Sequence, residues 1–578
     1  MPEKTRRLEL LALRGFSRAA AELAASSGDE TAAPPARAAA AMALFRLRYA
    51  EGRFAEAWRN LELSFALAGP ARFEGRDEGA ALCLSRLGRH SEALDRLGRL
   101  TDGLNPADPS SAHLLMLEAA VRGEKMLAEG RPPEEAEEIQ LAAINRVLTA
   151  GGLEPIARRD PAGPLSPGNI HAPSAKPYNG PMVKVSVIMP AFNAAETIEA
   201  GIRGLLAQTW ANLEIIVVDD GSTDQTAAVA ARLAGEDGRV RLVRQTGNQG
   251  VYRAQNRGAA EADGEFVTVC GSDDWPHPRR VEILAARLMS RPELVTVRGR
   301  LCRCGPRLEC GGGWEPSAAF ASDPSSHVYR RSMFDEIGPW DNEVRISADT
   351  ELIDRIFRVY GPSATAEISF PPFLAFCLDG SPGQLTRSGP THLRTAEHAA
   401  GARFHYFKAY RHWHLKQLAS GRPLDIRQKS FSVPPAIRPE RPALHYGLIV
   451  AAELNRPNEE AAALLSAGAG RGEKTAVINW PAYSEPSAAV ICPEMYEMCF
   501  DRAIDILCSA DHCETDLLKF AGPLDLDNFL DAYPEVRARR AEIVIGETQR
   551  VWENFFLPDI EKAVKDERLR SQWPPDRP

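Results

Sequence analysis

Short apolar runs alternate with amphipathic helix patterns over residues 183–290, and this alternation constrains the fold more than any other feature of the chain. The apolar runs cover residues 183–189, 214–219, 240–244 and 265–270. They are apolar on both faces, as are strands of a parallel sheet covered by helices. Helix-spaced apolar side chains lie between and after them: Ile198, Ile202, Leu205 and Leu206, then Val281, Leu284, Ala285 and Leu288. The pattern predicts a doubly wound α/β domain, which binds ligands beyond the carboxyl ends of its strands.

Polar and aromatic residues follow three of the predicted strands where each strand ends. They are Pro190, Phe192 and Asn193 after the first strand, Asp219 and Asp220 after the second, and Ser272, Asp273, Asp274 and Trp275 after the fourth. Carboxylates after the second strand can accept hydrogen bonds from a base N–H and from ribose hydroxyls. Those after the fourth offer hard oxygen ligands to a divalent cation that bridges two phosphates. The residues at the strand ends therefore predict a crevice that binds a nucleoside diphosphate.

Taken in order, these motifs resemble an inverting family 2 glycosyltransferase of the A-type fold, over about residues 183–390. The resemblance rests on Pro-x-Phe-Asn at 190–193, Val-Asp-Asp-Gly-Ser-Thr-Asp at 218–224, Asn-Gln-Gly at 248–250, Ala-Gln-Asn-Arg-Gly at 254–258 and Ser-Asp-Asp-Trp at 272–275. Each motif alone is ordinary loop chemistry. Together they imply a nucleotide-sugar donor, a Mn²⁺ or Mg²⁺ ion, and direct displacement at the anomeric carbon by an acceptor hydroxyl.

The resemblance also assigns residues to roles. It implies nucleotide contacts by Pro190, Phe192, Asn193, Asp219, Asp220, Asn256 and Ser272, and metal ligation by Asp273 and Asp274. The family takes its catalytic base from an Asp at the start of a downstream helix, and Asp349 in the segment 346–352 matches that position. The alternative is that Asp349 only caps this helix, where acidic residues are favoured. Glu351 is the second candidate for the base.

Three further residues are candidates for a lid or border of the donor and acceptor site. Trp275 follows the acidic pair, although an aromatic side chain there often serves packing. Arg355 is placed to neutralise a phosphate, or to pair with an acidic residue one turn earlier in its helix. Thr386 lies in the segment 381–389, which resembles the family's Ser-Leu-Thr loop and has Gly383 and Gly389 as hinges.

The sequence departs from the family pattern at two positions. Gly271 stands where the metal motif usually begins with another Asp, which predicts a lowered affinity for the metal. Ala348 precedes the expected base where the family often has an acidic residue, which removes an acceptor contact. Both departures keep a non-catalytic descendant of the family among the alternatives.

Residues from about 10 to 150 have a helical composition, rich in Ala, Leu, Glu and Arg. The motif Gly-Arg-Phe-Ala-Glu-Ala that begins at Gly52 is echoed 36 residues later at Gly88, and a looser copy begins at Gly130. This spacing resembles tetratricopeptide repeats, which pair helices around such turns. An Ala-rich helical bundle with chance similarity is the alternative. Either module predicts docking of a protein partner or self-association.

The whole chain is expected to be an A-type glycosyltransferase domain with a Rossmann-like mixed sheet, preceded by a helical repeat domain and followed by a smaller α/β domain. The predicted parts are a tetratricopeptide-like domain at 1–153, a Pro-rich linker at 154–182, the catalytic domain at 183–395, a helical extension at 396–432 and a C-terminal domain at 433–578. The last part has strand patterns at 446–452, 475–479 and 542–546, separated by helix patterns as in half of a Rossmann-like domain. No Gly-rich phosphate loop follows its first strand.

Composition excludes several classes of protein. The 69 Lys and Arg against 78 Asp and Glu give a net charge of −9, which argues against a general nucleic-acid binder. Ten cysteines in 578 residues are too sparse for a disulfide scaffold and are expected to be reduced thiols. No run of about 18 apolar residues predicts a transmembrane segment. We therefore expect a cytoplasmic protein, in solution or peripheral at the inner face of the membrane.

The leading hypothesis is a metal-dependent inverting glycosyltransferase of bacterial polysaccharide or glycoconjugate synthesis, with a glycan, lipid-linked or protein acceptor. The alternative is a non-catalytic sugar-nucleotide-binding scaffold that recruits partners through its helical repeats. A nucleotidyltransferase is a weaker third hypothesis, because residues 191–196 lack the Gly-rich, basic loop that it would need. Metal-dependent turnover distinguishes the first hypothesis from the second.

Overall fold

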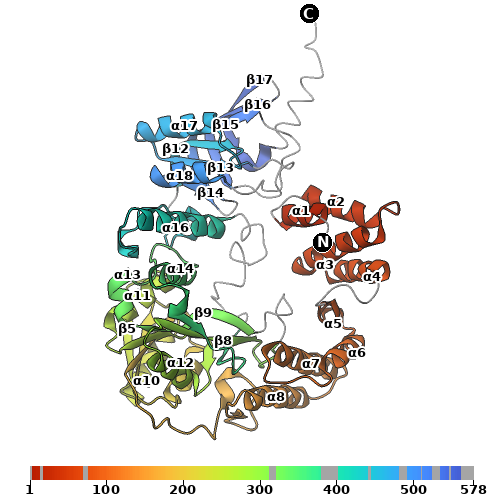
Figure 1. Ribbon diagram of the computed structural model, residues 1–578, viewed down its shortest axis with the longest axis vertical. Coiled ribbons are helices and arrows are strands. Elements are labelled where there is room, and N and C mark those ends of the chain that lie inside the picture. Colours follow the sequence, from red (N-terminus) through yellow and green to blue (C-terminus); the bar gives the residue numbers. More distant parts are fainter. Residues whose placement is uncertain are drawn as a thin grey trace, which may run out of the picture.

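The computed structural model describes residues 3–13, 17–68, 76–310, 320–378, 401–440, 444–480, 491–508, 511–523, 534–545 and 548–560. Figure 1 shows the parts of the chain arranged around an open arc. Helices α1–α8 form one limb, the central α/β domain lies at the bottom, and α16 with the C-terminal sheet forms the other limb. Within the described residues, no helix is both long and apolar enough to span a membrane.

The N-terminal limb is built from consecutive helices that pack on one another. They are α1 (Glu3–Leu13), α2 (Ser17–Gly28), α3 (Pro34–Ala50), α4 (Phe54–Ala68), α5 (Arg76–Arg86), α6 (His90–Thr101), α7 (Pro109–Ala128) and α8 (Pro133–Ala150). Gly52, Gly88 and Gly130 lie in the turns after α3, α5 and α7, with φ of 74°, 74° and 76°. A left-handed backbone favours glycine, so the glycines of the repeated motif mark helix-turn-helix units. The limb is helical as predicted, and its membership of the tetratricopeptide family stays a prediction.

The Pro-rich segment 154–182 connects this limb to the central domain. It contains the short strands β1 (Ala157–Arg158) and β2 (Ile170–His171), which pair antiparallel, and the 3₁₀ turn η1 (Pro167–Asn169). Ile156, Leu165 and Ile170 are buried. The connection is therefore packed against its neighbours along part of its length.

The central domain is a mixed sheet in the order β5-β4-β3-β6-β9-β8-β11-β7, with β10 beside β8. Its strands are β3 (Val185–Ala191), β4 (Leu213–Asp219), β5 (Val240–Arg244), β6 (Phe266–Val269), β7 (Asp274–Pro276), β8 (Thr296–Cys304), β9 (Phe320–Arg330), β10 (Thr365–Glu367) and β11 (Ala375–Leu378). Strands β3–β6 are parallel, as their apolar pattern predicts, whereas β9 runs antiparallel to β6 and β8. The predicted Rossmann-like mixed sheet is confirmed.

Helices cover both faces of this sheet (Figure 1). They are α9 (Ile198–Leu206), α10 (Thr226–Glu236), α11 (Val251–Glu261), α12 (Arg280–Ser290), α13 (Ser332–Ile337) and α14 (Ala348–Tyr360), with the 3₁₀ turn η3 (Pro362–Ala364) after α14. The predicted stripes bury Ile198, Ile202, Leu205, Val281, Leu284, Ala285 and Leu288. Burial of these apolar faces supplies the main favourable free energy of the domain.

Helix α16 (Ala402–Ala419) follows the central domain, with the 3₁₀ turns η5 (Ile426–Gln428) and η6 (Pro435–Ile437) after it. The C-terminal sheet has the order β14-β13-β12-β15-β16-β17 and is parallel except between β16 and β17. Its elements are β12 (Leu444–Ala452), α17 (Glu459–Gly470), β13 (Thr475–Asn479), α18 (Pro493–Asp501), β14 (Asp505–Leu507), β15 (His512–Pro523), β16 (Glu535–Ile545), β17 (Thr548–Phe556) and η7 (Leu557–Asp559). The three strand patterns expected here fall on β12, β13 and β16, whereas β14, β15 and β17 had no recognised sequence signal.

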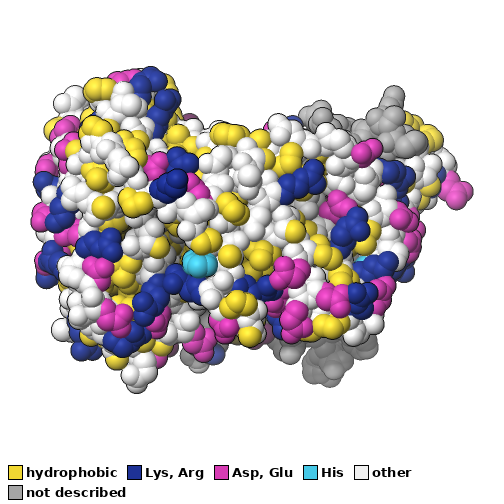
Figure 2. All heavy atoms as spheres, turned by 90° about the horizontal axis from the view of Figure 1, so that it is seen from below, with side chains coloured by type: hydrophobic (Ala, Val, Ile, Leu, Met, Phe, Trp, Pro, Cys, Tyr) yellow, Lys and Arg dark blue, Asp and Glu magenta, His cyan; other side chains and the backbone are white. Residues whose placement is uncertain are grey.

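Two hydrophobic cores join the parts of the chain. One continues from α7 and α8, through Met116, Ile144 and Leu148, to one face of the central sheet. The other runs from the opposite face through α14 and α16 to β12 and α18 of the C-terminal sheet. On the face that Figure 2 shows, acidic and basic side chains are interspersed rather than segregated by sign.

Candidate active site

The residues of the predicted crevice lie at the edge of the central sheet where β3, β4 and β6 end. Ala191 pairs with Asp219 in the parallel register, and the Asp220 N–H donates to the Ala191 carbonyl over 2.8 Å. The first two strand-end loops are joined further by Asn193, whose N–H donates to Ser222 Oγ over 3.0 Å and whose Oδ1 accepts from the Thr223 N–H over 2.9 Å. Hydrogen bonds within the protein therefore hold Asn193, and its neighbour Phe192 stays 38% exposed.

Asp219 and Asp220 have different roles although they are adjacent. Asp219 is fully buried, and its Oδ1 accepts from the Ser222 N–H over 3.2 Å. Its Oδ2 lies 3.6 Å from Arg244 Nε and has no hydrogen-bond donor among the described residues. Asp220 instead accepts from the Gln249 and Gly250 N–H groups, each over 2.8 Å. Burial raises the pKa of Asp220 above its usual value.

The acidic pair after β6 is organised around Gly271. The Gly271 N–H donates to Asp274 Oδ2 over 3.1 Å. A Cβ at position 271 would lie 2.8 Å from Asp274 Oδ2 and 2.9 Å from Asp273 Oδ1, closer than real Cβ atoms come. The missing side chain thus lets two carboxylates approach one backbone position.

The described residues contain no group of three acidic, His or Cys side chains set to hold a metal. Mg²⁺ commonly uses one or two carboxylates and completes its shell with water and substrate phosphates. Asp273 and Asp274 fit that kind of site, in which the donor's diphosphate supplies further ligands.

Asn256 lies in α11 and does not face the crevice with free polar groups. Its Nδ2 donates to the Trp340 carbonyl over 2.8 Å, and its Oδ1 accepts from the Trp340 N–H over 3.1 Å. Both ends of the carboxamide therefore hold the loop before α14. Contact of Asn256 with the nucleotide stays a prediction.

Asp349 is in the first turn of α14, as the sequence predicts. Its Oδ1 accepts from the N–H of Thr350 over 2.7 Å, and its carboxylate is hydrogen-bonded to the hydroxyl of Tyr252. Burial, and then the nearby Asp349 charge, raise the pKa of Tyr252 well above its usual value, so the phenol stays protonated and donates. The Asp349 side chain is only partly buried. It therefore combines a local contact within the first turn of α14 with a second contact to another element.

The backbone before Asp349 is held in an uncommon conformation. Ser347 has a φ of 71° and is buried, and its Oγ accepts from Arg403 Nε of α16 over 2.6 Å. Left-handed backbone is costly for a residue with a Cβ and persists where surrounding contacts fix it. Sequence reasoning did not single out Ser347, Tyr252 or Arg403, because their partners are distant in the chain.

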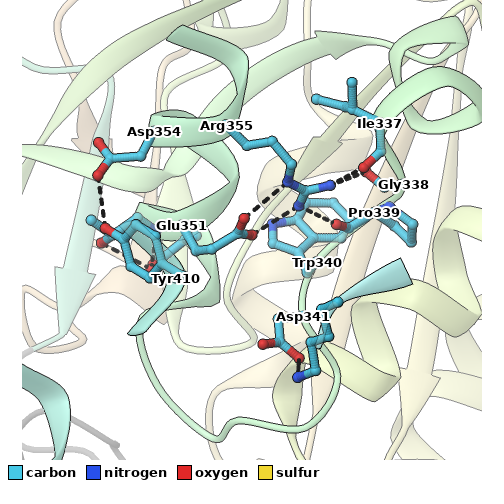
Figure 3. Close-up of polar contacts among 12 residues, drawn as sticks. Ile337, Gly338, Pro339, Trp340, Asp341, Glu351, Asp354, Arg355 and Tyr410 are labelled. Atoms are coloured by element: carbon cyan, nitrogen blue, oxygen red, sulfur yellow. Dashed lines mark hydrogen bonds and ion pairs between the residues drawn. The ribbon is translucent and has the colours of Figure 1, made fainter. Parts of the chain in front are cut away.

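Arg355 and Glu351 form a buried ion pair, which is the second of the two expectations stated for Arg355 (Figure 3). Arg355 Nε and Nη2 donate to the Glu351 carboxylate over 3.0 and 2.9 Å. The remaining guanidinium hydrogens reach the carbonyls of Ile337, Gly338 and Pro339. His414 Nε2 lies 2.9 Å from Glu351 Oε1, and all three side chains are fully buried.

These contacts also settle the charge of Glu351. Burial alone would raise its pKa, but Arg355 and His414 together hold it below the usual value. An ionised, shielded carboxylate is unsuited to take a proton from a substrate, and Arg355 has no face turned to a phosphate. Both residues therefore stabilise the structure behind Asp349.

Trp275 serves packing, the second of the two expectations stated for it. It lies in β7, is 2% exposed, and its ring centroid is 5.9 Å from that of Phe376. His277, two residues further, is buried, and its Nε2 lies 3.0 Å from the Glu154 carbonyl of the connecting segment. Thr386 and the segment 381–389 lie outside the described residues, and Pro190 and Ser272 stay predictions for nucleotide contact.

The comparisons with known proteins agree with this site. Residues 186–337 match the family model for glycosyl transferase family 2. The matched residues carry the motifs that follow β3, β4 and β6.

Curated relatives are glycosyltransferases. The chain is 33% identical over 113 residues to the glycosyltransferase GlyG of Streptococcus pneumoniae, which is 20% of this chain and 38% of that protein. It is 29% identical over 176 residues to a PGL/p-HBAD biosynthesis glycosyltransferase of Mycobacterium bovis, which is 30% of this chain and 69% of that protein. The chain spans 38% and 49% of the length of the first two curated relatives that it matches.

Solved structures give partial matches of low overall similarity. A crystal structure of S. aureus TarS residues 1–349 with UDP covers 34% of this chain and 60% of that one, with 18% identity and a TM-score of 0.29. Glucosyl-3-phosphoglycerate synthase from Mycobacterium tuberculosis, solved with Mn²⁺, UDP-glucose and phosphoglyceric acid, covers 34% and 77%, with 20% identity and a TM-score of 0.25.

Proposed function

We propose that the central domain transfers a sugar from a nucleotide-sugar donor to an acceptor hydroxyl, with inversion at the anomeric carbon. A series of contacts between the nucleotide side of the site and Asp349 supports this proposal. Asp220 fixes the loop that ends at Gly250, Tyr252 follows in the first turn of α11, and the Tyr252 hydroxyl meets Asp349. The contacts thereby link the nucleotide side of the crevice to a carboxylate suited to proton abstraction.

In this mechanism Asp219 accepts a hydrogen bond from the nucleotide through Oδ2, which has no hydrogen-bond donor among the described residues. Asp349 accepts the proton of the acceptor hydroxyl while that oxygen attacks the anomeric carbon from the face opposite the leaving nucleoside diphosphate. Tyr252 orients the Asp349 carboxylate through its hydrogen bond. Asp273 and Asp274 would hold a divalent Mn²⁺ or Mg²⁺ ion, which supplies positive charge to the departing diphosphate.

The remaining parts have supporting roles in the proposal. Residues 1–153 would dock a protein partner or a second copy, and residues 433–578 would support the acceptor side of the site. We place the protein in the cytoplasm or at the inner face of the membrane, with a glycan, lipid-linked or protein acceptor.

The test measures binding and turnover separately on the full chain. Calorimetric titrations with UDP and with GDP, each with and without Mn²⁺, identify the nucleotide, and release of free sugar from the matching sugar nucleotide reports hydrolysis. Asp349→Asn should keep nucleotide binding within about twofold and lower turnover by roughly 10² to 10⁴. The matched control is Asp354→Asn on the same helix, whose carboxylate contacts Tyr410 and Arg411 of α16 instead.

Full turnover by Asp349→Asn would reduce this residue to a helix cap. A second candidate function, the sugar-nucleotide-binding scaffold, is favoured by Gly271, which replaces one acidic position of the metal motif. Nucleotide binding by the wild-type chain without hydrolysis of any sugar nucleotide would select the scaffold.

A further inference from the structure

A cavity of about 350 Å³ lies between the helical limb and the central domain. Its helical wall comes from α5, α7 and α8 and is largely apolar, with Leu82, Leu117, Val121 and Leu127 among its residues. The opposite wall is the end of β8 and the turn after it, from Arg303 to Glu309. Small-molecule sites are typically apolar hollows of this size with a few placed polar groups.

The charged side chains that line the cavity balance one another. They are three arginines, Arg86, Arg303 and Arg307, and three glutamates, Glu124, Glu137 and Glu309. Glu137 accepts from Arg158 Nη2 and from the Leu165 N–H, each over 2.9 Å, and lies 3.7 Å from Arg307. Glu124 accepts from Ser85 Oγ. A balanced wall favours an uncharged ligand over an anion such as a diphosphate.

Gln140 of α8 gives the cavity its specific polar group. Its side chain is 4% exposed, and neither its amide nitrogen nor its amide oxygen has a hydrogen-bond partner among the described residues. A buried carboxamide without partners is destabilising, and its two donors and one acceptor become available to a ligand toward which the side chain turns. A ligand hydroxyl both donates and accepts, so hydroxyl groups satisfy Gln140 where a purely anionic or apolar ligand does not.

The cavity is close to the acidic pair of the crevice. Cys377 of β11 pairs with Asp274 of β7 on one side and with Arg303 of β8 on the other. Two strand spacings, about 10 Å, therefore separate the backbone of Asp274 from the start of the cavity wall. Strand β8 runs parallel to β6 across β9, so the turn after β8 lies at the same edge of the sheet as the strand-end loops.

We propose that this cavity is a saccharide subsite of the acceptor, in which Gln140 hydrogen-bonds the hydroxyls of a neutral sugar unit next to the one that is glycosylated. The inference rests on the proposed function for its link to catalysis, because it names the chemistry of the acceptor. It assigns the last helices of the N-terminal limb to substrate recognition by direct contact.

The test begins with binding alone, on the full-length chain. Saturation-transfer NMR is recorded with a panel of neutral methyl glycosides: methyl β-glucoside, methyl β-galactoside, methyl α-mannoside and methyl N-acetyl-β-glucosaminide. Gln140→Leu, which removes both amide groups at similar volume, should weaken binding of the recognised glycoside at least tenfold. The same variant should leave the Tm unchanged or raise it, since no internal hydrogen bond is lost. Glu134→Gln, an exposed position on the same helix, is the control and should change neither.

Ala120→Phe provides a second variant that leaves Gln140 intact. Ala120 lies on α7, is half-buried and lines the cavity, so a phenyl ring there occupies its volume. Loss of glycoside binding in both variants supports the proposal. The proposal would be overturned if Gln140→Leu bound the glycoside as tightly as the wild type, whether or not its Tm was lowered. It would also be overturned if the wild type bound none of the glycosides.

Kinetics separate this inference from the proposed function. With a donor and an acceptor glycan in hand, Gln140→Leu should raise the acceptor KM and leave nucleotide binding and donor hydrolysis at wild-type levels. Glycoside binding by a wild-type chain that hydrolyses no sugar nucleotide would uphold the subsite and reject the transferase. Hydrolysis of a sugar nucleotide by a wild-type chain that binds no glycoside would uphold the transferase and reject the subsite.

Discussion

The hydroxyl of Tyr252 hydrogen-bonds the carboxylate of Asp349, and this contact joins the start of α11 to the start of α14. A phenol that donates to a carboxylate stabilises the ionised form and fixes its direction. The expected base is thus oriented by a residue that lies two positions after the loop held by Asp220.

Tyr252→Phe should lower kcat about tenfold and leave nucleotide binding unchanged. Loss of the hydrogen bond disfavours the ionised carboxylate, so the acidic limb of the pH–rate profile should move to higher pH, by on the order of one unit. A pH profile of kcat/KM checks this. Tyr360→Phe, whose hydroxyl bonds Glu336 over 2.8 Å, is the control. An unmoved limb in Tyr252→Phe would contradict the positioning role.

Gly271→Asp restores the acidic residue of the family pattern, yet it should weaken Mn²⁺-dependent nucleotide binding, by roughly tenfold. The physical reason is space, since the new Cβ would lie within 3 Å of oxygens of both Asp273 and Asp274. Gly271→Ala should behave similarly because it adds the same Cβ without the charge. Gly238→Ala, where an added Cβ meets nothing within 4 Å, controls for the loss of glycine. Tighter metal-dependent binding by Gly271→Asp in calorimetry would show that the carboxylates move aside.

Arg355→Met should lower the free energy of unfolding by about 3–5 kcal/mol, because it leaves the Glu351 charge buried without its main partner. Urea denaturation measures the change. Arg203→Met breaks a surface pair with Glu199 at the same helical spacing and should cost less than about 1 kcal/mol. If the two substitutions lowered the free energy of unfolding equally, water or another cation would have to compensate the Glu351 charge.

His277 should make stability depend on pH. Burial lowers the pKa of His277 to about 4, from an ordinary value of 6.5, so the folded state keeps it neutral while the unfolded state takes up a proton. Its contribution is fully present above pH 6.5 and falls by roughly 3 kcal/mol as the pH drops toward 4.

His277→Gln should flatten the pH dependence of urea denaturation between pH 6.5 and 4. Glutamine retains an N–H that can reach the Glu154 carbonyl, so the loss of titration is separated from the loss of the hydrogen bond. His445→Gln, at an exposed position, should leave the slope unchanged. A slope that is the same in His277→Gln and wild type would assign the titration to other buried groups.

The local periodicity of the sequence was enough to place β3–β6 and the strand-end loops, since each depends on neighbours within a few residues. In α14 the charged side chains of Glu351 and Arg355 are fully buried, whereas the apolar side chain of Phe357 is 41% exposed. Local periodicity could not predict this, because His414, which completes the cluster, lies 63 residues further along the chain from Glu351. Similarly, the two hydrogen bonds between Asn256 and Trp340 span 84 residues, so sequence proximity gave no sign that this side chain was already engaged.

The cluster of Glu351, Arg355 and His414 has a consequence for synthesis of the chain. Glu351 and Arg355 leave the ribosome well before α16, which brings His414 to Glu351 and Tyr410 to Asp354. A nascent chain that ends between α14 and α16 thus exposes the apolar side of α14 and has only part of the network that neutralises its buried charges. N-terminal parts of a protein generally fold first during translation. Here the helix that carries Asp349 is completed late, so the crevice becomes competent only when most of the polypeptide has emerged.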